Sequence, residues 1–295
     1  MIVHVLDNLE NLEPDFIYEM LAKVRVNLCL DVGAGAGDKA LKMLANAQQA
    51  QVICFEPFPG NIGFLTDSLY GEPRGFVVQA AAAACNSEAR FAIPSVVNGS
   101  EEGWETRQGY SSLGYMQHVS TLKDLARQIL DYTRHTRSIS VSTVRLDNFI
   151  HVNHTFVKID VQGGEYEVLR GLTPSMRAGQ VDIIYAEFSG DARILRLLDK
   201  LDYIVYDSFF IWLPGCEDEP NVLRRARRVP LSIGAYAFEG VLDFEDRSFE
   251  GYCRKIRNLR KRSRFIQTDL IAIHRSMNAT FLEAITQLSK DRADS

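Results

Sequence analysis

The sequence predicts an α/β protein built on a mostly parallel sheet with helices on both faces. Short apolar runs without polar alternation recur along the chain, which is the pattern of strands buried on both faces. Segments with a helical spacing of apolar residues separate these runs. Small or polar residues follow each run directly, and ligands in such sheets bind beyond the carboxyl ends of the strands. The residues that follow the strands are therefore the candidates for function.

The predicted strands are short apolar runs, except for one alternating, half-buried strand at 139–146. The first, at 28–32, leads into a glycine-rich loop, and the second, at 51–55, leads into Glu56. A late apolar run, TDLIAI at 268–273, predicts the last strand. The remaining strands are expected at 75–81, 89–94, 155–161, 181–188 and 203–210.

Helices are predicted between the strands by the periodicity of their apolar residues. Pro14 suits the first turn of a helix that reaches about Val24. Gly171 is expected as the C-cap of a helix that begins at Glu165. The other helices are expected at 39–47, 61–69, 122–132, 193–201 and 281–288. The polar, glycine-bearing region 95–115 is expected to be a long functional loop.

The composition is that of an ordinary globular protein, with 46% hydrophobic and 24% charged residues among 295. The net charge of −5 predicts no general attraction to nucleic acid or to an anionic membrane. The five cysteines are scattered without a CxxC pair, which predicts free thiols in a reducing compartment and no cysteine zinc site. No signal-peptide pattern and no transmembrane run are found, so we expect a cytoplasmic protein.

The loop LDVGAGAGD, residues 30–38, follows the first predicted strand and carries Gly33, Gly35 and Gly37. A cluster of glycines indicates a tight turn or a close approach of the backbone to another group. Two ligands suit a strand, a glycine loop and a second strand ending in an acid: a dinucleotide and S-adenosylmethionine (SAM). The GxGxG spacing departs from the dinucleotide pattern GxGxxG. Asp31 would repel a pyrophosphate but suits the ammonium of a methionyl group, so the residues favour SAM.

Several motifs together resemble the FkbM family of SAM-dependent methyltransferases. They are LDVGAGAGD (30–38), CFEPFPGN (54–61), GYSSLG (109–114), VKIDVQGGEYEVLRGL (157–172) and IIYAEFS (183–189), in matching order from about Val26 to Phe210. The resemblance implies the class I methyltransferase fold, which is Rossmann-like with a seven-stranded, mostly parallel sheet and an antiparallel last strand. It also implies methylation of hydroxyls on sugars, glycans or polyketide-type natural products. Family members often carry Glu where this chain has Gln162, so we assign no base chemistry to that position.

With this resemblance we expect a single methyltransferase domain over residues 1–295. Its core would span 26–210, preceded by a helical extension at 1–25. A basic insertion at 211–265, which exceeds what the core needs, would separate the core from the last strand and C-terminal helix at 266–295.

The resemblance also implies which residues hold the cofactor. Asp31, Gly33, Ala34 and Gly35 would frame the methionyl end of SAM, and Glu56 would accept hydrogen bonds from the ribose hydroxyls. The residues expected nearer the adenine or over the cofactor are Pro57, Asn61, Ala81 and Ser112. For Asn61 a capping role is an equal alternative, and core packing explains Ala81 about as well.

A hydroxyl acceptor has to lose a proton, so a general base is expected at a strand end. Asp160, which closes the fourth core strand, is the first candidate. Glu187 at the end of the fifth core strand and Glu165 at a helix start are alternatives. Lys158 lies two residues before Asp160 on the same strand face, where it would pair with an acid or anchor the substrate. His118 and His135, near the predicted substrate loop, are weaker candidates for the base.

The oxygen ligands of Asp160, Glu165 and Glu187 leave a divalent metal open as an alternative. We do not expect one, because these carboxylates lack a tight DxD spacing and the histidines lack ligand spacing. Arginine-rich stretches at 224–228 and 254–264 leave several interpretations open. They form a solvated face, or they bind an anionic, glycan or carrier-bound acceptor, and nucleic acid is not expected. The alternatives to O-methylation are methylation of another nucleophile, such as an amine, and a non-catalytic SAM-binding scaffold. The sequence leaves homo-oligomerisation open.

Overall fold

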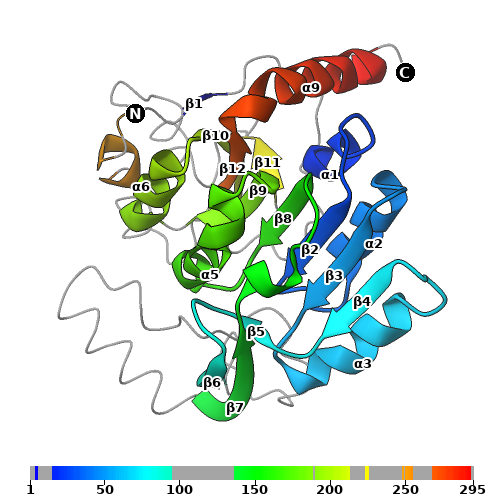
Figure 1. Ribbon diagram of the computed structural model, residues 1–295, viewed down its shortest axis with the longest axis vertical. Helices are drawn as coiled ribbons and strands as arrows, with labels where there is room; N and C mark the ends of the chain where they lie inside the picture. The colour runs from blue at the N-terminus through cyan, green and yellow to red at the C-terminus, as the bar shows by residue number, and fades with distance from the viewer. Residues whose placement is uncertain are drawn as a thin grey trace, which may run out of the picture. The chain divides into compact units, whose positions relative to one another are not determined.

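The computed structural model describes residues 4–5, 15–94, 136–188, 190–212, 223–225, 248, 250–254 and 268–293 (Figure 1). The chain divides into two compact units. One is Arg25–Val181, and the other combines Met1–Val24 with Asp182–Ser295. The predicted loop at 95–115, the helix at 122–132 and most of the basic insertion lie outside the described residues.

The unit Arg25–Val181 is built on a parallel sheet of β2 (Leu28–Val32), β3 (Gln51–Phe55), β4 (Gly75–Val78) and β8 (Thr155–Ile159). The strand order is β8-β2-β3-β4, and each neighbouring pair is parallel. Every residue of β2 and β8 is buried, including the charged Asp31 and Lys158 within these otherwise largely apolar runs. The helices of this unit are α2 (Asp38–Asn46), α3 (Pro59–Ser68) and α5 (Glu165–Arg177), with a 3-10 turn, η2, at Leu146–Phe149.

A small second sheet lies between β4 and β8 in the sequence. Its strands β5 (Ala81–Ala82), β6 (Ser87–Pro94) and β7 (Thr136–Val144) have the order β5-β7-β6, with β6 and β7 antiparallel. The predicted strand 75–81 is therefore divided between the two sheets. The small sheet buries Ala81, Phe91 and Val141 against Phe58, which anchors it beside the loop that follows β3.

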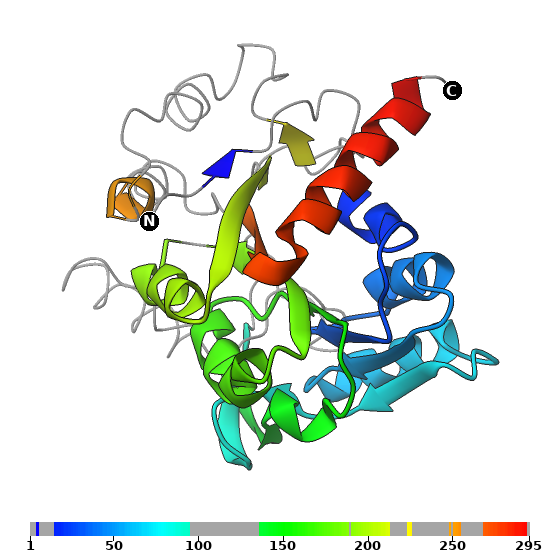
Figure 2. The ribbon, with the colours of Figure 1, turned by 45° about the horizontal axis from the view of Figure 1, so that its top comes forward.

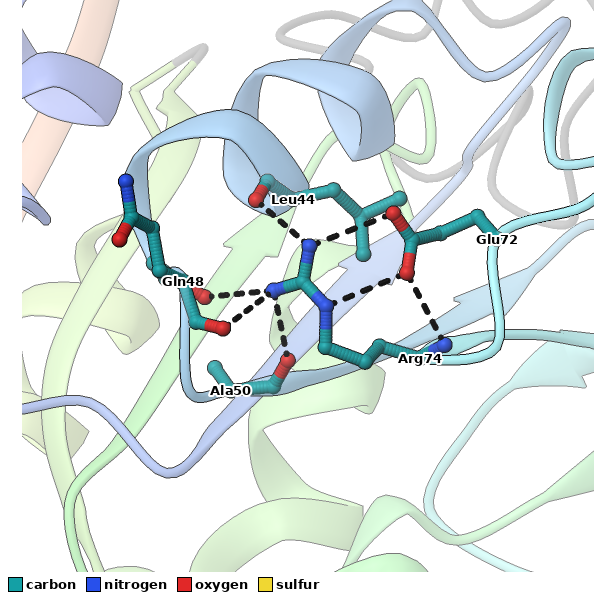
Figure 3. A network of polar contacts seen from close by, with 6 residues as sticks. Leu44, Gln48, Ala50, Glu72 and Arg74 are labelled. Atoms are coloured by element: carbon teal, nitrogen blue, oxygen red, sulfur yellow. Dashed lines mark hydrogen bonds and ion pairs between the residues drawn. The ribbon is translucent and has the colours of Figure 1, made fainter.

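Arg74 joins the end of α2 to the start of β3 (Figure 3). Its guanidinium donates hydrogen bonds to main-chain carbonyls in the last turn of α2 and in the segment that follows it, and to the side chain of Glu72. The carbonyls belong to Leu44 at 3.0 Å, Ala47 at 3.1 Å, Gln48 at 2.9 Å and Ala50 at 3.5 Å. The planar fork of arginine suits this multiple contact, and it fixes the turn that feeds β3 into the sheet.

The helix that begins at Glu165 does not end at Gly171, so this prediction is wrong. α5 continues to Arg177 and includes Pro174. A Cβ atom at position 171 would lie 2.1 Å from the carbonyl oxygen of Ala83. The glycine therefore serves close packing of α5 on the Ala83 main chain rather than a C-cap. Similarly, α1 (Phe16–Met20) ends before Val24, and α3 begins at Pro59 instead of Asn61.

The second unit contains β9 (Val181–Phe188), β10 (Tyr203–Trp212) and β12 (Thr268–His274). The first residue of β9, Val181, is counted with the other unit. β12 lies between β9 and β10 and is antiparallel to both, so the predicted antiparallel last strand is confirmed. Short strands β1 (His4–Val5) and β11 (Leu223–Arg225) each pair with β10. The helices are α1, α6 (Ala192–Lys200) and α9 (Asn278–Ala293), with a 3-10 turn, η4, at Arg275–Met277.

α9 lies alongside α1 (Figure 2), with ion pairs between Lys23 and Asp291 and between Glu19 and Arg292. The predicted fold class is confirmed. The seven strands expected from the sequence are all present among the described residues, and β12 is antiparallel to both of its neighbours, β9 and β10. In the described part of the chain, no helix combines the length and apolarity needed to cross a membrane.

The described cysteines are free thiols. Cys29, Cys54 and Cys253 are buried and Cys85 is exposed, while Cys216 lies outside the described residues. Burial raises the pKa of Cys29 and Cys54, with a further contribution from the charge of Asp31, so both remain protonated at neutral pH.

Candidate active site

The three glycines after β2 serve three different purposes. At Gly33 (φ +77°) a Cβ atom would lie 1.9 Å from the carbonyl oxygen of Asp160, so only glycine allows the loop to pass this close to the end of β8. Gly37 (φ +99°) is the N-cap of α2, and a Cβ atom there would contact Leu65 of α3 at 3.0 Å. Gly35 (φ +56°) has open space on its Cβ side. Backbone exposed in this way suits the close approach of a ligand.

Asp31 and Lys158 form a buried ion pair between adjacent strands. The parallel register of β2 and β8 sets the two residues opposite one another, and Lys158 Nζ lies 3.1 Å from Asp31 Oδ1. The same ammonium donates a 2.8 Å hydrogen bond to the carbonyl of Gly33. Burial disfavours the ammonium, but the charges of Asp31 and Asp160 outweigh it and the pKa of Lys158 is raised. Lys158 is therefore a permanent cation here and holds the glycine loop to β8.

The predicted contact between Asp31 and a cofactor ammonium stays a prediction. The Asp31 side chain has no exposed surface and faces Lys158. Asp31 is linked to the glycine loop through Lys158, which pairs with Asp31 and donates a hydrogen bond to the carbonyl of Gly33.

Glu56, which follows β3, closes the glycine loop with its carboxylate. Its Oε2 accepts a hydrogen bond from the main-chain N–H of Gly35, and its Oε1 accepts one from Phe58, both at 2.8 Å. Burial raises the pKa of Glu56, while these hydrogen bonds and one from the Asn61 side chain oppose the rise. A carboxylate has about four acceptor sites, and these three donors leave about one for a further donor such as a ribose hydroxyl.

The other residues expected around the cofactor have mixed surroundings. Asn61 lies inside the first turn of α3, whose N-cap is Phe58, and its side chain holds Glu56. Ala81 packs into the apolar cluster under the small sheet. Pro57 is partly exposed between Glu56 and Phe58. Ser112, His118 and His135 lie outside the described residues.

Asp160 is the first residue after β8, and its carboxylate is the accessible member of the group. Its side chain is 45% exposed, whereas Lys158 and Asp31 are buried. Lys158 Nζ lies 3.9 Å from Oδ2, and Gln162 Nε2 donates a 3.0 Å hydrogen bond to Oδ1. The structure thus brings together Asp31, Gly33, Lys158 and Asp160, as the strand-end argument predicts.

Glu165 opens α5 directly after this loop and is almost completely buried. Its Oε1 accepts a 2.8 Å hydrogen bond from the N–H of Gly163. Burial, aided by the charge of Asp160, raises the pKa of Glu165 to about 7 despite the opposing hydrogen bonds from the main chain. The sequence marks Glu165 only as an acid at a helix start, because its burial depends on how α5 packs.

Glu187 belongs to the other unit, near the carboxyl end of β9. It is buried and lies opposite Asp269 of β12. On the same strand pair, Tyr185 donates a 2.7 Å hydrogen bond to Asp269, and burial raises the pKa of Tyr185. Among the described residues, no group of three or more His, Cys, Asp or Glu side chains has the arrangement to hold a metal ion.

Residues 31–205 match the family model of the methyltransferase FkbM domain. The chain belongs to the FkbM methyltransferase family. The match covers more than half of the chain and includes the glycine loop, Glu56 and the Lys158–Asp160 strand end. This match confirms the resemblance to the FkbM family that the sequence motifs indicate. The matched domain is that of a SAM-dependent methyltransferase.

Several solved structures are similar to this chain. The FkbM methyltransferase from Methylobacillus flagellatus KT has 15% identity and a TM-score of 0.39, over 62% of this chain and 40% of that one. The precorrin-6y C5,15-methyltransferase from Geobacter metallireducens GS-15 has 9% identity and a TM-score of 0.39, over 92% and 93%. A SAM-dependent O-methyltransferase from Thermotoga maritima has 10% identity and a TM-score of 0.36, over 88% and 63%. No curated protein matches the chain.

The residues of the unit Arg25–Val181 fit the SAM that the family implies. Gly35 has a left-handed backbone with open space beside it, and the Cβ atom of any other residue would occupy part of that space. The buried carboxylate of Glu56 lies next to it and retains acceptor capacity beyond its three donors Gly35, Phe58 and Asn61.

Proposed function

We propose that this protein is a SAM-dependent O-methyltransferase that acts on a hydroxyl group of a sugar, a glycan or a polyketide-type natural product. The observation that carries the proposal is the position of Asp160. This half-exposed carboxylate follows β8, while its Lys158 neighbour ties the same strand end to the glycine loop. An accessible carboxylate next to the cofactor loop is what the deprotonation of an alcohol requires.

SAM would supply a methyl group activated by an adjacent sulfonium. On this proposal Gly33, Ala34 and Gly35 frame its methionyl end, and Glu56 accepts the ribose hydroxyls. Asn61 orients Glu56, while Asp31 acts through Lys158 to hold the loop. Pro57, Ala81 and Ser112 remain proposed neighbours of the rest of the cofactor.

Asp160 would orient the acceptor hydroxyl and accept its proton. Lys158 cannot serve as the base, because its raised pKa keeps the ammonium protonated. It would instead stabilise negative charge at Asp160 before the proton arrives. Holding the acceptor in line accounts for much of the rate, since positioning contributes roughly 7–11 kcal/mol at best. Glu187 stays an alternative base, and no metal is required in this scheme.

The choice of acceptor is proposed to lie in two segments. One is 95–135, the stretch of sequence between β6 and β7 of the small sheet, and this sheet packs on Phe58. The arginine-rich stretches at 224–228 and 254–264 would favour an anionic or carrier-bound acceptor. Phosphorylated or carboxylated sugars are therefore the first acceptors to test.

Calorimetry of SAM and S-adenosylhomocysteine (SAH) binding tests the cofactor half of the proposal. We expect micromolar binding to the wild type and at least a roughly hundredfold loss in Glu56→Ala, which removes a buried charged acceptor. Glu167→Ala is the matched control, because Glu167 pairs with Arg170 on the surface of α5. An unchanged affinity in Glu56→Ala would contradict this assignment.

The proposed acceptor is tested by transfer of a tritiated methyl group from SAM to neutral, phosphorylated, carboxylated and amino-substituted methyl hexopyranosides. Methyl ethers are the expected products. Methylation of amines with no reaction at hydroxyls would instead favour the N-methyltransferase alternative. Tight SAM binding without transfer to any acceptor class would favour a scaffold.

A further inference from the structure

We propose that Gln162 is a positioning residue that holds the carboxylate of Asp160 in its reactive orientation. The inference rests on the proposed function, because it assumes that Asp160 handles the proton of the acceptor. The action proposed here is the one that Gln162 exerts on Asp160.

The first observation is the hydrogen bond itself. Gln162 Nε2 donates to Asp160 Oδ1 at 3.0 Å, while Lys158 Nζ lies 3.9 Å from Oδ2. The two carboxylate oxygens therefore face two different donors, one neutral and one cationic. This arrangement fixes the rotation of a side chain that is otherwise 45% exposed and would turn freely in solvent. Orientation of the base matters because proton acceptance requires alignment with the hydroxyl.

The second observation is the backbone of Gln162. Its φ is +54°, a left-handed conformation that few residues other than glycine adopt. The next residue, Gly163, continues at φ +106°, so the chain reverses sharply after Asp160. This reversal lets the side chain two residues later fold back onto the carboxylate. A glycine at 162 would adopt the turn without strain, but it would provide no donor.

The third observation concerns the chemistry of the donor. A carboxamide remains neutral at every working pH, so it can hold Asp160 without competing for the proton. Lys158 and Glu165 are titratable groups that face Asp160, and a further acid at 162 would add repulsion from a third side. An amide in this place orients the base and leaves its charge unchanged.

The test uses Gln162→Gly, Gln162→Glu and the control His154→Gly in the full-length protein. His154 has the same left-handed backbone (φ +65°) but precedes β8, at the opposite end from Asp160. The carboxyl of Asp160 is titrated by ¹³C NMR after labelling of aspartate, with the signal assigned by Asp160→Asn. Thermal unfolding, SAH affinity and methyl transfer to the methyl hexopyranosides are measured on each variant.

In Gln162→Gly we expect a melting temperature equal to or above that of the wild type, since the strain is relieved. The Asp160 midpoint should nevertheless rise by roughly half a pH unit, because a donor to the charged form is lost. Turnover should fall about ten- to a hundredfold with SAH affinity unchanged. In Gln162→Glu the midpoint and the acidic limb of the pH–rate profile should move to still higher pH. His154→Gly should alter none of these except stability.

An Asp160 midpoint in Gln162→Gly that equals the wild-type value would overturn the proposal, whatever happens to stability. The titration needs neither cofactor nor acceptor, so it decides the orientation of Asp160 even when no acceptor reacts. Wild-type protein that binds no SAH and methylates nothing would count against the proposed function instead. The two failures are therefore distinguishable.

Discussion

At the scale of single residues, each glycine of the loop 30–38 has different surroundings and therefore a different reason to be glycine. Gly33 makes room for the Asp160 main chain and Gly37 for α3, while Gly35 has open space on its Cβ side, where we propose that the cofactor binds. The sequence predicts the loop and its cofactor from the spacing of the glycines. It does not divide the roles among them, because each role depends on a contact with a distant element.

Alanine substitutions separate these roles. Gly33→Ala should cost more than about 3 kcal/mol of unfolding free energy or prevent folding, because its Cβ would collide with the Asp160 carbonyl. Gly35→Ala should cost only about 1–2 kcal/mol for its left-handed backbone, yet weaken SAH binding at least roughly tenfold. Urea unfolding and calorimetry measure the two effects. Equal losses of stability would refute the distinction.

The buried pair of Asp31 and Lys158 gives a second prediction at this scale. Lys158→Met should lower the free energy of unfolding by about 3–5 kcal/mol, because it leaves the fully buried carboxylate of Asp31 without its cation. Asp31→Asn combined with Lys158→Met should recover part of this loss, since the orphaned charge is gone. Both are measured by urea unfolding at pH 7. A double variant less stable than Lys158→Met would argue against charge as the cause.

Some residue contacts at the site follow from the sequence and others do not. The pairing of Lys158 with a strand-end acid was predictable, because residues two apart share a face of a strand. The hydrogen bond from Gln162 to Asp160 was not predictable, because it requires a left-handed backbone at Gln162 and no sequence pattern indicates that conformation. The position of Asn61 beside Glu56 likewise depends on α3 beginning earlier than its periodicity suggests.

At the scale of elements, α5 illustrates how a local signal misleads. A glycine after a short periodic stretch predicts a helix end, yet Gly171 lies within the helix because the Ala83 main chain packs against it. The predicted strand 75–81 fails similarly, since its last residue joins a different sheet. Both errors arise where one element's course is set by another that is far away in sequence.

Glu165, the first residue of α5, should make the free energy of unfolding depend on pH. The pKa of Glu165 is about 7 in the folded protein, mainly through burial, against 4.5 for an ordinary glutamate. The folded state therefore binds more protons than the unfolded state between these values. The stability that the neutral acid provides is present below pH 4.5 and is lost as the pH rises to about 7. The loss is on the order of a few kcal/mol.

Glu165→Gln removes the titration but keeps a carbonyl acceptor for Gly163. We expect this variant to melt above the wild type at pH 8, with the difference shrinking toward pH 5. Differential scanning calorimetry over this range measures it, with Glu167→Gln as a control from the same helical turn. A difference that does not change with pH would exclude Glu165 as its source.

At the scale of the whole molecule, the alternation of buried strands and helices was predictable, because apolar runs and helical periodicity are local patterns. The antiparallel last strand was implied by the family resemblance. The placement of the small sheet was not predictable, since its strands meet through pairing between 87–94 and 136–144. The division into the units Arg25–Val181 and Met1–Val24 with Asp182–Ser295 also depends on contacts across the chain.

This division gives a prediction about the cofactor. The proposed SAM residues that the structure describes all belong to Arg25–Val181, while the alternative base Glu187 belongs to the other unit. SAH should therefore slow hydrogen exchange most at the amides of Gly35 and Phe58, which donate to Glu56. Protection in the other unit should be smaller, and Glu56→Ala should abolish both effects. Stronger protection around Glu187 than around Glu56 would move the cofactor assignment to the second unit.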